Sequence, residues 1–121
     1  MIKIMLCEDD PTMISLLTTL LEYEGYTVLG YQDCIDFDGL LKVIRREKPD
    51  IILLDVHLRQ MNGFDLLRMI RKDTELRQPR ILMSSGMDMG MESHVEGADG
   101  FLLKPYMPEE LIKKIQETLG T

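Results

Sequence analysis

Charged and hydroxyl side chains stand directly after four short apolar runs of this 121-residue chain. Glu8 and Asp9 follow the first run, Asp55 the third, Ser85 the fourth and Lys104 the fifth. Carboxylates that lie close together repel each other, and a shared proton or a bound divalent cation relieves that repulsion. Because the candidate ligands are hard oxygens, with no His or Cys cluster in line, Mg²⁺ is the expected ion, with Mn²⁺ as an alternative.

These residue types suit phosphoryl chemistry. A metal ion and Lys104 would neutralise the equatorial oxygens of a phosphoryl group, and Ser85 would donate a hydrogen bond to it. An aspartate can itself be the nucleophile and form an acyl phosphate. The hypothesis requires that folding brings Asp9 and Asp55 to the same edge of the molecule.

Short apolar runs alternate with stretches of helical periodicity. The runs predict five strands, at residues 2–7, 27–31, 51–54, 80–83 and 98–103. Between them, apolar side chains recur at three- and four-residue spacing, which predicts helices. Asp10 and Pro11 predict an N-cap and first turn, and Gly25 predicts the end of that helix. Residues 85–97 carry the weakest helical pattern, because Gly86 and Gly90 disfavour a helix interior.

The pattern also predicts how the strands are arranged. Runs that are apolar at consecutive positions fit strands covered by helices on both faces, which means a parallel sheet with right-handed crossovers. We therefore expect an α/β fold, a flavodoxin-like (βα)5 three-layer sandwich with strand order 2-1-3-4-5. In that order the first and third strands are neighbours, so Asp9 and Asp55 end on the same rim.

Composition limits the classes of protein to which the chain can belong. Apolar residues make up 45% and charged residues 29%, which suits a single domain over residues 1–121. A net charge of −7 disfavours direct binding to nucleic acid. The apolar runs are too short to cross a membrane, so a cytoplasmic location is expected. Cys7 and Cys34 lack metal-like spacing, and no structural disulfide is expected between them.

Four separated motifs, taken together, resemble the receiver domain of two-component response regulators over the whole chain. They are Glu8-Asp9, Asp55, Ser85-Gly86, and Lys104-Pro105 after residues 97–101. The resemblance implies that Asp55 is the phosphoacceptor. It also implies that Asp9 and Asp55 bind magnesium directly with the main-chain carbonyl of His57, while Glu8 acts through water.

The same resemblance assigns the remaining site residues. Ser85 matches the switch hydroxyl, Lys104 the phosphate-binding lysine, and Phe101 the aromatic residue whose rotamer reports phosphorylation. Gly63 matches the glycine that closes the loop after the phosphoacceptor. In this interpretation the chain is not an enzyme. A sensor histidine kinase or a histidine phosphotransfer protein donates the phosphoryl group, and a conformational change regulates an effector or a fused output domain. The domain is expected to be either stand-alone or part of a longer response regulator.

Three features depart from the family pattern. Arg59 stands four residues after Asp55, where family members often have proline. The predicted switch hydroxyl is Ser, where Thr is commoner. The stretch from Ser85 to Lys104 is about one helical turn short, roughly three residues, so we expect the fourth helix to be short, displaced or mobile.

Two alternative functions stay open. The unusual fourth helix would suit a receiver-like interaction scaffold that works without phosphorylation. A magnesium-dependent phosphatase with Asp55 as nucleophile is disfavoured, because His57 stands where such an enzyme would need a second aspartate.

Overall fold

The structure, a computed structural model, describes residues 1–31, 36–59 and 61–120. Its main sheet has five parallel strands in the spatial order β2-β1-β3-β6-β7. These strands are β1 (Lys3–Cys7), β2 (Thr27–Tyr31), β3 (Ile51–Asp55), β6 (Arg80–Ser85) and β7 (Gly100–Leu103). Counted along the chain, they are the first to fifth strands of this sheet. The predicted flavodoxin-like order 2-1-3-4-5 is therefore confirmed.

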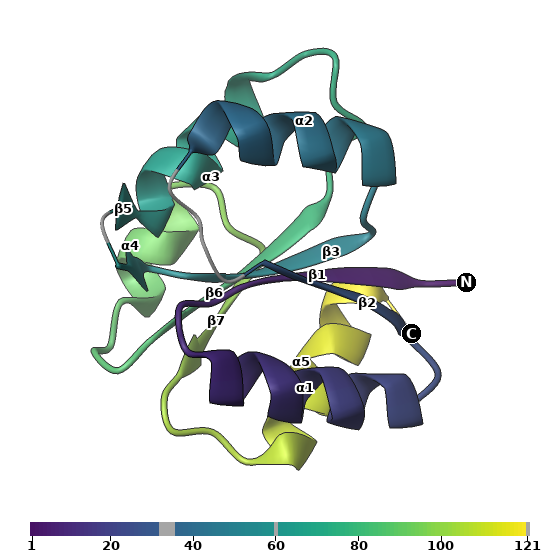
Figure 1. The fold of residues 1–121 in the computed structure, drawn as a ribbon. Helices are drawn as coiled ribbons and strands as arrows, with labels where there is room; N and C mark the ends of the chain where they lie inside the picture. Colours follow the sequence, from purple (N-terminus) through teal and green to yellow (C-terminus); the bar gives the residue numbers. More distant parts are fainter. Residues whose placement is uncertain (32–35, 60, 121) are drawn as a thin grey trace.

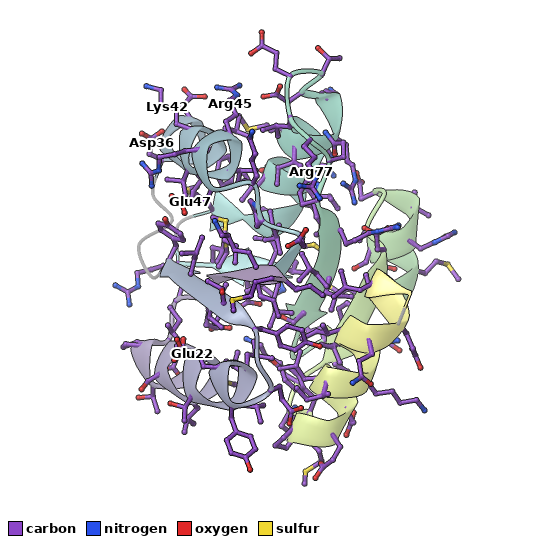
Figure 2. The ribbon with its side chains drawn as sticks, turned by 90° about the vertical axis from the view of Figure 1, so that its right-hand side faces the viewer. Glu22, Asp36, Lys42, Arg45, Glu47 and Arg77 are labelled. Atoms are coloured by element: carbon purple, nitrogen blue, oxygen red, sulfur yellow. The ribbon has the colours of Figure 1, made fainter. Side chains whose placement is uncertain are left out.

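Helices cover the sheet on both faces. They are α1 (Pro11–Tyr23), α2 (Phe37–Glu47), α3 (Gly63–Lys72), α4 (Gly90–Val95) and α5 (Pro108–Leu119). Helices α1 and α5 lie on one side of the sheet, and α2 and α3 lie on the other (Figure 1). Figure 2 shows Lys42 and Arg45 on the outer surface of α2, as expected for a helix with one buried stripe.

The core consists of two clusters, one on each face of the sheet. In β3, Ile52 and Leu54 belong to the cluster beneath α2 and α3, whereas Ile51 and Leu53 belong to the cluster beneath α1 and α5. Successive side chains of a strand point to opposite faces, so a strand covered on both sides needs apolar residues at every position. This explains why the strands appear in the sequence as uninterrupted apolar runs.

Polar caps determine where several helices begin and end. The Asp10 carboxylate accepts from the backbone N–H of Thr12 at 2.9 Å, with Pro11 in the first turn of α1. Beyond the end of α1, Gly25 has a φ of +94°. The predicted cap and stop of this helix are confirmed. Asn62 caps α3 in the same way, accepting from the N–H of Phe64 at 2.8 Å.

The structure departs from the sequence prediction in several places; β6, for example, continues to Ser85, two residues beyond the expected end. A two-stranded antiparallel hairpin, β4 (His57–Leu58) with β5 (Met61–Asn62), follows β3 and was not predicted. The last strand begins at Gly100, two residues later than expected, because Asp99 accepts from the N–H of Ile81 and ends the preceding turn. The fourth helix is short, as predicted.

Two other expectations concern the chain as a whole. None of the helices in the described part of the chain has both the length and the apolar character needed to cross a membrane. Cys7 is buried in β1. Cys34 lies outside the described residues, so the expectation that these two cysteines form no disulfide stays a prediction.

Candidate functional site

Lysine and carboxylate side chains from three strands meet at the carboxyl edge of the main sheet. Lys104 Nζ lies 2.8 Å from Glu8 Oε2 and 3.1 Å from Asp55 Oδ2. Glu8 and Asp55 are each only 8% exposed. The structure therefore joins three of the residues singled out in the sequence into one buried ion cluster.

The parallel register explains why these residues meet. Cys7 in β1 is level with Leu54 in β3, so Glu8 and Asp55 both emerge one residue further along neighbouring strands. Ser85 at the end of β6 is level with Leu103, which puts Lys104 just beyond the sheet. The backbone N–H of Lys104 donates to the carbonyl oxygen of Ser85 at 2.8 Å. The lysine side chain then spans the end of β6 to reach both carboxylates.

Burial and neighbouring charges shift the pKa values of Asp55 and Lys104 in this cluster. Burial raises the pKa of Asp55 above 3.8, and the Glu8 carboxylate raises it further, against the opposing effect of Lys104. Burial by itself would lower the pKa of Lys104, but the hydrogen bond to Glu8 and the two carboxylate charges raise that pKa above 10.5. Lys104 therefore stays charged, and the cluster keeps a fixed cation beside Asp55.

Asp9 lies at the same rim but outside the lysine bonds. Burial raises the pKa of its carboxyl above 3.8; Arg59 lowers it through its charge and its backbone N–H, and Glu8 raises it. Arg59 thus stands next to the predicted acidic pocket, a contact that the sequence prediction did not include. Three carboxylates against one ammonium and the Arg59 guanidinium leave this rim with a charge of −1 when all are ionised.

The hairpin β4–β5 holds the chain close to Asp55. The backbone N–H of His57 donates to the Asp55 carboxylate, while the His57 side chain is exposed. The N–H of Gly63 donates to the carbonyl of Val56 at 2.7 Å. A Cβ on Gly63 would lie 2.2 Å from the main-chain oxygen of Asp55, so only glycine fits here. This glycine is the one to which the family resemblance assigns the closing of the loop.

Ser85 and Phe101 lie on the side of the site next to α4. Ser85 is buried, and its Oγ accepts from the N–H of Met87 at 3.1 Å. Phe101 is half-buried against the core cluster under α2 and α3. Its Cδ2 would be 3.7 Å from a Cβ on Gly90, the first residue of α4. Both predicted switch residues therefore adjoin the short fourth helix.

The donor set fits a magnesium ion. Among the described residues, no three side chains of His, Cys, Asp and Glu form a ready-made metal cluster. The predicted site does not need one, since Mg²⁺ keeps several waters and takes one or two carboxylates. Two carboxylates, a main-chain carbonyl and water would supply oxygen ligands only, and a divalent ion would offset the excess negative charge of the rim.

Comparison with known proteins identifies the family. The family described as the response regulator receiver domain matches residues 4–116. The chain belongs to this family. Receiver domains are phosphoacceptor switches of two-component signalling systems, so this chain is a regulatory domain of that kind.

Individual relatives support the assignment. This receiver domain is 33% identical to the DNA-binding response regulator MtrA of Mycolicibacterium smegmatis over 124 residues, covering 97% of the chain and 50% of MtrA. The chain thus spans about half the length of this relative.

Solved structures agree with the sequence comparison. The BeF3-activated N-terminal receiver domain of RstA from Klebsiella pneumoniae has a TM-score of 0.84 and 30% identity, covering 98% of this chain and 99% of the other. The receiver domain of the sensor histidine kinase PA1611 from Pseudomonas aeruginosa has a TM-score of 0.81 and 25% identity, covering 98% of both chains. That structure has a magnesium ion coordinated in the active-site cleft.

The sequence prediction missed two contacts that involve arginines, one at the site and one outside it. One is Arg59 beside Asp9. The other is Arg68 of α3, which binds Glu96 next to α4 at 2.7 and 2.8 Å. Arginine on an amphipathic helix or in a turn has no distinctive local pattern, so only spacing in three dimensions reveals these partners.

Proposed function

We propose that Asp55 accepts a phosphoryl group from the phosphohistidine of a sensor histidine kinase or a histidine phosphotransfer protein. The observation that carries this proposal is the position of Lys104, whose ammonium bonds to Asp55 at 3.1 Å at the buried rim. Cations placed in advance beside a phosphoryl acceptor stabilise the charge of the transferred group. Asp55 has this cation beside it, and a short, constrained loop follows it in the chain.

The transfer is a displacement at phosphorus. A carboxylate oxygen of Asp55 forms the new P–O bond while the P–N bond to the donor imidazole breaks, and the imidazole leaves with the bonding pair. Lys104 pairs with the oxygens of the incoming group. The backbone N–H of His57 also acts on the Asp55 carboxylate and lowers its pKa, which favours the ionised nucleophile.

Mg²⁺, or Mn²⁺ in its place, is the proposed cofactor. Asp9, Asp55 and the main-chain carbonyl of His57 would hold it directly, with Glu8 acting through water. When bound, it neutralises charge on the phosphoryl oxygens. The oxygen-only donor set, the charge of the rim and the magnesium in the PA1611 receiver support this assignment.

Phosphorylation would shift an existing equilibrium between two conformations. The Ser85 hydroxyl would turn from the Met87 N–H to donate to the phosphoryl group, and Phe101 would follow. A swing from 1:99 to 99:1 requires about 5.5 kcal/mol of differential stabilisation. Charge-assisted hydrogen bonds contribute roughly 1.5–3 kcal/mol each, so two or three new bonds to one phosphoryl group could supply it.

The output belongs to the same proposal. A separate effector, or an output domain fused to this domain, would respond to the switch; the second arrangement is supported by the length of MtrA. We propose that residues 1–121 act as one cytoplasmic domain without direct contact to nucleic acid or membrane. We further propose that any turnover is limited to its own acyl phosphate.

The test uses a small phosphodonor with Mg²⁺ and intact-protein mass spectrometry. We expect a mass increase of one phosphoryl group that is stable in acid, labile in base and absent from Asp55→Asn. Asp38→Asn, which removes an exposed carboxylate on α2, is the matched control and should be labelled like the wild type. An unlabelled wild type, under conditions that label other receivers, would contradict the proposal.

A further inference from the structure

Helix α4 buries few side chains of its own, although its N-cap residue, Met89, is partly buried against the core cluster under α2 and α3. Ser93 is its one buried residue, and the Ser93 hydroxyl has no hydrogen-bond partner among the described residues. Met91 and Val95 are 78% and 76% exposed. A six-residue helix is too short to be stable by itself. Contacts other than buried side chains of the helix must therefore fix its position.

Two arginines of α3 provide such contacts at the carboxyl end of α4. Arg68 binds Glu96, the C-cap residue, through two bonds, from Nε at 2.7 Å and from Nη2 at 2.8 Å. Arg71 Nε donates to the carbonyl of Gly97 at 3.0 Å. A planar guanidinium bound at two points restrains orientation as well as distance. The carboxyl end of α4 is thus clamped to α3.

The amino end of α4 has no comparable anchor on another helix in the described part of the chain. Its N-cap residue, Met89, makes no side-chain capping bond, and Gly90 N–H bonds within the same segment to Asp88 at 3.3 Å. The N–H of Met87 bonds to the Ser85 hydroxyl at 3.1 Å. This end is therefore tied to the residue that the proposed function makes the switch.

Helix α3 is a firm base for the clamp. It buries five residues, and its first residue, Gly63, packs directly against the backbone of Asp55. The two ends of α4 thus differ in attachment: one is bound to a well-packed helix, and the other to the hydroxyl that the proposed function directs to the phosphoryl group on Asp55.

We propose that Arg68 is a positioning residue that fixes the carboxyl end of α4, so that the rearrangement driven from Asp55 is confined to residues 86–91. The amino-terminal part of this segment moves relative to the clamped end at Glu96, and the exposed Met87 and Met91 side chains move most. This inference rests on the proposed phosphoacceptor function. The inference goes beyond that function because it assigns to Arg68 the role of limiting the response to residues 86–91.

Amide hydrogen exchange across residues 86–97, with and without beryllofluoride and Mg²⁺, tests the proposal. In the wild type we expect the beryllofluoride-induced change at residues 86–91 and none at residues 93–97. In Arg68→Gln we expect residues 93–97 to exchange about fivefold faster without ligand, the factor that corresponds to an ion pair of about 1 kcal/mol. With ligand, the change should extend over the whole segment.

Two controls separate positioning from general destabilisation. Asp65→Asn removes the other partner of Arg68, a 2.7 Å bond within α3, and should leave exchange in α4 unchanged. Arg45→Gln removes an ion pair with Asp73 on another part of the surface and should also have no effect there. The charge-swapped pair Arg68→Glu with Glu96→Arg should restore the wild-type pattern.

The outcomes distinguish the two proposals. Unchanged exchange at residues 93–97 in Arg68→Gln, or a wild-type response that covers residues 86–97 evenly, overturns the positioning role of Arg68. A wild type that shows no response to beryllofluoride at any residue overturns the proposed phosphoacceptor function, while the ligand-free comparison still decides whether Arg68 holds α4.

Discussion

Gly63→Ala tests whether the backbone contact behind Asp55 positions the site. The new Cβ would lie 2.2 Å from the main-chain oxygen of Asp55, 3.1 Å from its carbonyl carbon and 3.2 Å from Val56 Cα. All three atoms belong to the backbone, so no side-chain rotation can relieve the overlap. Because Gly63 N–H is also bonded to the Val56 carbonyl, the start of α3 and the loop must separate together.

The size of the effect follows from that geometry. Reaching ordinary contact at 3.4 Å requires a shift of more than 1 Å in the backbone. Overpacking of this kind costs about 1–3 kcal/mol, offset by about 0.4–1 kcal/mol because alanine lowers the entropy of the unfolded chain. We expect the free energy of unfolding to fall by about 1–2 kcal/mol. A displacement of about 1 Å at a reacting group can slow a reaction by about a hundredfold, so phosphorylation should slow markedly.

Urea unfolding and the initial rate of labelling by a small phosphodonor measure the two effects. Gly86→Ala is the matched control for stability, because its Cβ would meet nothing within 4 Å. That variant should gain about 0.4–1 kcal/mol through the unfolded state. If Gly63→Ala proved as stable as the wild type and were labelled at the same rate, the close approach would not be what positions Asp55.

Three further changes test other contacts. Ser93→Ala removes a buried hydroxyl that has no hydrogen-bond partner among the described residues. Thermal unfolding should therefore show a free energy of unfolding that is higher by about 1 kcal/mol, and an unchanged melting curve would count against that reasoning. Lys104→Met leaves Glu8 and Asp55 without the ammonium group that neutralises them. We expect urea unfolding to show that the free energy of unfolding falls by about 2 kcal/mol and that Mg²⁺ restores part of it. An unchanged free energy of unfolding would contradict the role of the lysine. Burial raises the pKa of Tyr106 from 10.0 to about 12, which favours the neutral phenol in the folded state. The free energy of unfolding is unaffected by this group below about pH 10 and falls by about 2–3 kcal/mol as the pH rises to about 12 and above, because the phenol then ionises more readily in the unfolded state. Urea unfolding of the wild type and Tyr106→Phe should therefore diverge over this range, because the variant has no phenol to ionise, and parallel curves would rule out the shift.

Local signals in the sequence were sufficient for the architecture. Strands covered on both faces must be apolar at every position, so the run at residues 51–54 by itself indicated a buried parallel strand. Asp10 with Pro11, and the turn at Gly25, marked the ends of α1 for reasons that lie within a few residues. The order of the strands was adopted from the flavodoxin-like arrangement, because the handedness of the crossovers does not by itself fix which strands are neighbours.

The candidate site was only partly predictable. The sequence indicated which residues end the strands, and the strand order predicted that Glu8 and Asp55 would share a rim. It could not show that Lys104 bonds to both carboxylates. Nor did it indicate the hairpin β4–β5, whose two-residue strands are too short to produce a periodic pattern.

What the sequence determined by itself, therefore, is the set of elements and the chemical character of their ends, because helices, turns and buried strands depend on neighbouring residues. Only the tertiary structure decided which charges meet. Lys104 and Glu8 are 96 residues apart in the chain, and Arg68 and Glu96 are 28 apart. A charged side chain at the end of a strand or on the outside of a helix has the same local pattern whatever its partner. The partner is chosen by the register of the sheet and the packing of the helices, which place distant residues within reach of one another.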